Sequence, residues 1–229
     1  MFLRTLTALI LTFLSVQARN DPLPNDPHTQ TVSISVNTSI LPAAIKFGTD
    51  THTPIGIVLD TDKPETLCEE YRHFTVQDTP VPEFLNHLLA GSDYVWAFEG
   101  QVVVIRPTHL SDQTRRVLHM TFGRFGGMRT TMQGLGTTLH GWIYSKLNPG
   151  SGFAGEILSS LDSEYFAQFN IQNASVEQIL NGIISLGSKG IWIFQLPKDF
   201  ERKKDVDLHT YSYKDDADSI QTICESIRH

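Results

Sequence analysis

The sequence predicts an α+β protein made of two related modules, each with two helices packed on small mixed sheets. Residues 74–89, FTVQDTPVPEFLNHLL, and residues 169–184, FNIQNASVEQILNGII, repeat the pattern of a strand followed by a helix. In both copies the apolar residues recur at the spacing that forms one buried stripe along a helix. Segments in which polar and apolar residues alternate lie around each copy, as expected of half-buried strands.

The composition is that of a globular protein with an acidic balance. Of its 229 residues 40% are hydrophobic, which is enough to build real cores. The formal net charge is −7, and no long basic block is present. We therefore expect no nucleic acid partner, because nucleic acid binding depends on Lys and Arg that neutralise phosphates. The sequence gives no reason to expect a cofactor.

The first 18 residues have the features of a secretory signal peptide. Arg4 precedes the apolar run TLTALILTFLSV, and VQA at 16–18 suits a signal peptidase. This run has about 12 residues, whereas a span of the bilayer takes about 20. We expect a periplasmic or secreted protein, without stable membrane insertion after cleavage. Residues 19–30, rich in proline, are expected to form a flexible lead-in.

The first module is expected at residues 31–107. Its elements, in order, are a strand at 31–36, a helix at 40–51, a buried strand at 55–59, a strand at 73–77, a helix from Pro80 and a hairpin around Glu99 and Gly100. Asp78 or Thr79 can cap the second helix. Pro80 suits its first turn, because the N–H that proline lacks would have no partner there.

The second module is expected at residues 117–197, in a degenerate form, followed by an extension at 198–229. Its elements are a strand at 117–122, a glycine-rich turn at 123–128, a helix at 129–146, a strand at 165–172, a helix that starts with a Ser175 and Gln178 capping box, and a strand at 190–197. One strand is either lost or replaced by residues 206–213. A final helix is expected at 216–227.

Few residues suggest catalytic or metal chemistry. The nine histidines show none of the spacings of helical metal ligands, and no serine lies in a G-x-S-x-G motif. His87 corresponds to Gly182 in the second copy, which favours a solvated side chain. The two cysteines, Cys68 and Cys224, can form a disulfide in an oxidising compartment if the fold brings them together. Trp96 and Trp192 can stack on a sugar, but alternating strand positions favour the core.

The first module resembles the secretin and TonB short N-terminal (STN) domain, which is akin to the N0 domain of secretins. The resemblance is carried by ILPAAIKFGTDTHTPIGIVLD at 40–60 and by FTVQDTPVPEFLNHLLAGSDYVWAFEGQVVVIRP at 74–107. It covers residues 31–107 well and 117–197 loosely. It implies a compact α+β fold that makes protein contacts in the periplasm. Residues after 107 do not show the many alternating strands of the receptor barrel or the secretin pore of those relatives, so we expect neither in this chain.

Three functional hypotheses follow. The first is a non-enzymatic, exported interaction protein that binds another envelope protein, in signalling, transport or secretion. Its partner would add a strand at an open sheet edge, for which QVVVI, with Gln101, Val103 and Ile105, is the candidate. The second is a small-ligand or glycan-binding protein that uses Tyr144 and Trp192 in a cleft between the modules. The third is a cell-envelope hydrolase.

Overall fold

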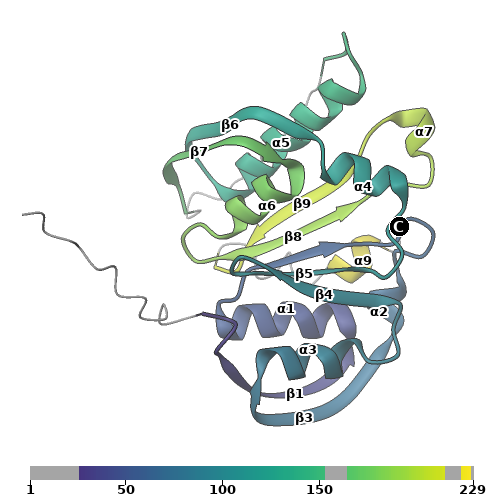
Figure 1. Cartoon of the computed structure of the whole chain (residues 1–229), viewed down its shortest axis with the longest axis vertical. Helices are drawn as coiled ribbons and strands as arrows, with labels where there is room; N and C mark the ends of the chain where they lie inside the picture. Colours follow the sequence, from purple (N-terminus) through teal and green to yellow (C-terminus); the bar gives the residue numbers. More distant parts are fainter. Residues whose placement is uncertain (1–25, 153–163, 215–222, 228–229) are drawn as a thin grey trace, which may run out of the picture.

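The computed structural model describes residues 26–152, 164–214 and 223–227. The expected signal peptide, and parts of the expected lead-in and final helix, lie outside the described residues. The protein is an α+β fold, as predicted. Figure 1 shows its layers: a two-stranded ribbon, a pair of helices, a five-stranded sheet, further helices and a second two-stranded ribbon.

The first module begins with β1 (Thr31–Ser39), which pairs antiparallel with β3 (Tyr71–Pro80). Helices α1 (Ile40–Thr51) and α3 (Val81–Leu89) lie between this ribbon and the central sheet (Figure 1). The apolar stripe of α3 is buried, as its helical spacing predicts. The other elements of this module are β2 (Ile55–Val58), the short helix α2 (Thr66–Glu69), β4 (Tyr94–Glu99) and β5 (Val102–Pro107).

The second module repeats the order of strand, helix, strand, helix and two further strands, but its described residues contain no strand between α5 and β7 that would correspond to β2. Its ribbon consists of β6 (Thr121–Thr130) and β7 (Phe166–Ser175), which are antiparallel. Helix α5 (Met132–Leu147) follows β6, and α6 (Val176–Ile184) follows β7 and starts with the expected capping box. The other elements are α4 (Asp112–Leu118), β8 (Gly190–Gln195), α7 (Phe200–Lys203), β9 (Asp207–Ser212) and α9 (Ile223–Ile227).

The central sheet joins the two modules. Its strand order is β4-β5-β2-β8-β9, and β2 pairs in parallel with both β5 and β8. Ile55 therefore lies opposite Val103 on one side and Ile191 on the other. The sequence left open whether the two modules pack together, and this mixed sheet shows that they do, because it contains strands of both. Strand β9 pairs with β8 and comes from residues 206–213, the expected replacement.

Both faces of the three inner strands of the central sheet, β5, β2 and β8, are buried. One face packs in the core that contains α1 and α3, and it presents Ile55, Ile57, Val103, Ile105, Ile191 and Ile193. The other packs in the core that contains α5 and α6, and it presents Val102, Val104, Trp192 and Phe194. Strands that are buried on both faces are apolar at consecutive positions. This burial explains the continuous apolar runs VVVI and IWIF.

Two expectations for the start of the second module are wrong. The first residues of the expected strand at 117–122 complete α4, whose start is capped by the side chain of Ser111. The expected turn at 123–128 lies inside β6. At Gly126 a Cβ atom would lie 2.3 Å from the carbonyl oxygen of Phe169, so glycine here allows the β7 backbone to approach closely. Glycine thus marks a close strand contact and not a turn.

The start of α3 also differs from the prediction. Pro80 is the N-cap residue, Pro82 lies in the first turn, and no side chain caps the helix. Asp78 instead has a left-handed backbone, with φ of 48°, and its N–H donates to Ser33 Oγ at 2.9 Å. Asn173, at the same place in the repeat, also has φ of 48°. Asp and Asn tolerate this conformation, so the repeat preserves a backbone kink at this position.

Candidate functional site

The segment at 101–105 does not form an edge of the sheet. Strand β5 pairs with β4 on one side and with β2 on the other. Val103 and Ile105 are fully buried, and Gln101 lies in the turn before the strand. The prediction that these three residues form an edge that binds a partner is therefore wrong. The run of valines belongs to an interior strand, whose two buried faces both require apolar side chains.

Strand β4 forms the edge on this side. Among the described residues it pairs only with β5, so no strand covers the backbone groups along its outer side. Val95 is 46% exposed, and Ala97 is exposed as well. The strand contains no proline or lysine, which commonly prevent pairing at sheet edges. His28 covers the far end, where its ring centroid lies 3.9 Å from that of Phe98. Residues 94–97 remain uncovered by this contact.

The opposite edge, β9, is less open. In the described part of the chain it pairs only with β8, but its exposed side carries Asp207 and His209, which form an ion pair at 2.8 Å between Oδ1 and Nε2. The hydrogen bond from His209 lowers the pKa of Asp207. Helix α5 packs against this strand, and a Cβ at Gly136 would lie 2.1 Å from Thr210 Oγ1. Charged side chains disfavour added strands, so β4 is the better binding edge.

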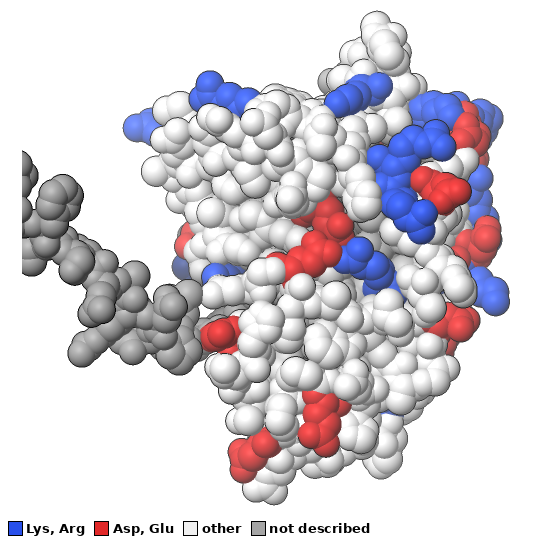
Figure 2. Space-filling view, viewed as in Figure 1, with Lys and Arg blue, Asp and Glu red and all other residues white. Residues whose placement is uncertain are grey.

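A polar network links the two modules beside the β4–β5 hairpin. Arg106 of β5 pairs with Glu99 of β4 and with Glu177 of α6, the latter at 3.3 Å. Asn181 Nδ2 donates to Glu99 Oε2 at 3.1 Å, and Trp192 Nε1 donates to Asn181 Oδ1 at 2.8 Å. Figure 2 shows acidic and basic side chains meeting in the middle of the visible face, where the modules join. The network therefore couples the edge hairpin to the second module.

Glu177 is the least satisfied member of this network. It is only 5% exposed, and its Oε1 atom makes no hydrogen bond, although it forms the 3.3 Å ion pair with Arg106. Burial raises the pKa of Glu177, attraction to Arg106 lowers it in part, and the charge of Glu99 raises it further. The carboxyl group therefore keeps its proton to a higher pH than an exposed glutamate.

The hydrogen bond between tryptophan and asparagine occurs in both modules. In the first, Trp96 Nε1 donates to Asn86 Oδ1 at 2.9 Å. Asn86 and Asn181 hold the same place in the sequence repeat, directly after a leucine of the apolar stripe. The sequence interpretation missed these asparagines, although they are identical polar residues in a largely apolar match. They join the second helix of each module to the following strand.

Tyr144 and Trp192 do not together form the ligand site that the second hypothesis expects. Trp192 is fully buried, so its ring cannot stack on a ligand. Tyr144 is half-buried on α5, and neither residue lines the described pockets. The exposed tryptophan of this module is Trp142, which is 40% exposed. Alternation along a strand cannot separate a buried ring from an exposed one when both faces of the sheet are covered.

The structure joins Cys68 of α2 to Cys224 of α9 by a disulfide, with 5.6 Å between the Cα atoms. The two residues are 156 positions apart in the sequence. Ile223, beside the bond, is 3% exposed and belongs to the core of the first module. The bond therefore ties α9 to the first module.

The described residues include no group of three or more His, Cys, Asp or Glu placed to hold a metal ion. His87 is solvated, as expected, with 57% of its side chain exposed. None of the described helices is long and apolar enough to cross a membrane.

Comparison with known proteins adds no relationship to this geometry: no family model, no curated protein and no solved structure matches the chain.

Proposed function

We propose that this protein is an exported, non-enzymatic interaction protein built from two STN-like modules. It binds another envelope protein, in signalling, transport or secretion, by strand addition at the outer edge of β4. The observation that carries this proposal is the open side of β4, an edge strand without proline or lysine and with exposed Val95 and Ala97. Peptides that add a strand obtain affinity from main-chain hydrogen bonds and specificity from alternate side chains.

The side chains along this edge indicate which kind of segment the partner would add. Val95 and Ala97 lie on one face of β4, and Tyr94 and Trp96 lie on the other. In the lower half of the visible face, over α1, α3 and β4, most of the surface is uncharged and the charged groups are mainly acidic (Figure 2). An extended segment with uncharged or apolar residues at alternate positions fits this surface. Each added backbone hydrogen bond contributes about 0.5–1.5 kcal/mol, so a short segment gives weak binding that side-chain contacts must strengthen.

The edge is preorganised before a partner arrives. Strand β4 is paired along its whole length with β5, which is itself an interior strand. Arg106 and Asn181 both contact Glu99 at the end of β4, so that end is held by both modules. A partner therefore loses little affinity to the ordering of this edge, because rigid binding surfaces reduce the entropic cost of association.

Site-specific crosslinking in the producing cells tests the proposal. A photoreactive amino acid at Val95 is expected to crosslink one envelope protein, identified by mass spectrometry. The same amino acid at Gln172, an exposed residue of β7, serves as the control and is expected not to capture it. The Ala97→Lys substitution should abolish capture at Val95, because a lysine on an edge strand disfavours the pairing of an added strand. Equal capture by the Ala97→Lys protein would contradict strand addition at β4.

A further inference from the structure

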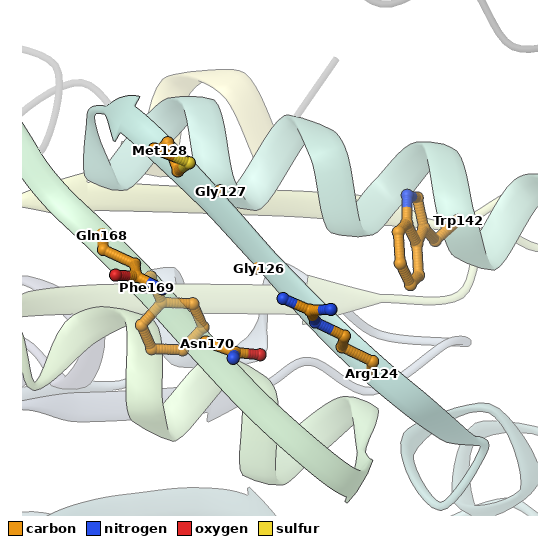
Figure 3. Close-up of a pocket in the computed structure, with 8 residues that line it drawn as sticks. All are labelled: Arg124, Gly126, Gly127, Met128, Trp142, Gln168, Phe169 and Asn170. Atoms are coloured by element: carbon orange, nitrogen blue, oxygen red, sulfur yellow. The ribbon is translucent and has the colours of Figure 1, made fainter.

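An open groove lies on the second module, away from β4. It has a volume of about 430 Å³ and lies where β6, β7 and α5 meet (Figure 3). The residues that line it are Arg124, Gly126, Gly127, Met128, Trp142, Gln168, Phe169 and Asn170. The two glycines place no side chain over the strand, which leaves the middle of the groove open. The groove thus depends on the glycine-rich stretch at 123–128, which the sequence predicts to be a turn.

The apolar part of the groove presents a fixed aromatic ring. Trp142 extends from α5 toward β6, and 40% of it is exposed (Figure 3). Its ring packs edge to face with Phe122 and Phe125, at centroid distances of 5.6 Å and 5.3 Å. Met128 is 76% exposed at the other end. An indole held by two buried or half-buried rings is a rigid apolar platform, and it costs little entropy to use.

The polar part of the groove consists of hydrogen-bond donors without partners. Within the described part of the chain, the side chains of Arg124, Gln168 and Asn170 make no hydrogen bond or ion pair. Figure 3 shows Asn170 extending from β7 toward Arg124 of β6. None of the lining residues is acidic. Figure 2 shows basic side chains without acidic neighbours along the upper left of the face, over β6 and β7. This part of the groove is suited to an anion.

We propose that this groove binds a sugar that carries a carboxylate. The apolar face of the ring packs on Trp142 and Met128, the carboxylate pairs with Arg124, and the hydroxyl groups bond to the amides of Gln168 and Asn170. Pockets for drug-sized, mostly apolar ligands usually bury 70–90% of the ligand surface. This groove is too open to do so, which argues against a small apolar ligand. A guanidinium matches the geometry of a carboxylate, and amides both donate to and accept from hydroxyl groups.

Isothermal titration calorimetry of the purified protein tests this inference with two matched probes. One is a β-1,4-linked oligomer of glucuronic acid, and the other is the neutral glucose oligomer of the same length and linkage. The acidic oligomer is expected to bind. Arg124→Gln should weaken its binding about ten- to a hundredfold, the loss expected for a hydrogen bond to a charged group. Arg129→Gln provides a control with the same charge change on the same strand, outside the groove. It should weaken binding less than about twofold, because solvent screens charges that are not in contact.

Trp142→Leu separates the apolar contact from the charge. This variant should also bind the acidic oligomer more weakly, and its melting temperature shows whether the module has kept its fold. Arg124 is exposed, so its substitution leaves the fold intact and gives a result even if the Trp142 variant unfolds. Equal binding of the neutral and acidic oligomers would overturn the inference. So would unchanged binding after Arg124→Gln, or no binding of either oligomer.

Discussion

Removal of the disulfide should change the stability of the whole protein, and not only that of its last helix. The perturbation is the double substitution Cys68→Ala and Cys224→Ala. The bond closes a loop that runs from α2 through the second module to α9. It thereby encloses all of the strands from β3 to β9. Without the disulfide, the unfolded chain has far more conformational freedom than the unfolded chain that the disulfide closes into a loop.

The size of the effect follows from the length of the loop. For a sequence separation of 156 residues, the chain-entropy relation gives a stabilisation of about 5 kcal/mol at 25 °C. Cys68 is 5% exposed, so its replacement also removes buried contacts. Wild-type protein treated with dithiothreitol keeps both sulfur atoms and loses only the bond. The difference between the reduced protein and the double variant therefore measures the packing contribution alone.

Urea denaturation followed by circular dichroism measures the free energy of unfolding of the oxidised, reduced and substituted proteins. The reduced protein should lose most of the 5 kcal/mol, with a midpoint shift to lower urea. Suppose instead that the loss is below about 1 kcal/mol and that only α9 becomes sensitive to protease. That result would refute the reasoning, because it would show that α9 separates from the core before global unfolding.

Three further predictions concern the junction of the modules. The raised pKa of Glu177 means that its contribution to stability is fully present below the ordinary value of about 4.5 and is lost as the pH rises through the pKa of the folded state. Glu177→Gln should therefore flatten the fall in the free energy of unfolding above pH 4.5, measured by urea denaturation at a series of pH values. Gly56→Ala should lower the free energy of unfolding by about 1–3 kcal/mol or more in the same assay, because the added Cβ would lie 2.2 Å from Trp192 Cζ2. An unchanged urea midpoint would show that the Trp192 ring can move to make room. Asn181→Ala should lower the free energy of unfolding by about 1–3 kcal/mol, because it leaves the buried indole N–H of Trp192 unpaired. Asn86→Ala should lower it less, because the half-buried indole of Trp96 can bond to water. Equal losses would count against burial as the cause of the difference.

Much of the fold could be predicted from local patterns. The helix α1, the apolar stripes of α3 and α6, the capping box and the β4–β5 hairpin are all confirmed, because each depends on residues close together in the sequence. The pairing of β2 with β8 could not be predicted. Their residues are more than a hundred positions apart, and an apolar run does not specify which other strand lies beside it.

The same limit explains the errors in the candidate sites. The run QVVVI is equally apolar at an edge or in the interior, and only the parallel partner β2 decides between them. The groove was missed because Gly126 and Gly127 in sequence suggest a turn, whereas they serve the close approach of two strands and the packing of Leu135. A usable signal was the identity of Asn86 and Asn181, since a polar residue repeated within an apolar stripe needs a partner.

The parallel pairing of β2 with β8 also determines the order in which the chain can finish folding. Strand β2 is made early, but its second neighbour begins at Gly190. Until that residue has been synthesised, the first module has an apolar strand with one side uncovered. Contacts between such distant segments form slowly, because a long loop must close first. A fragment that contains only the first module is therefore expected to aggregate, and a chaperone would be needed most during this interval.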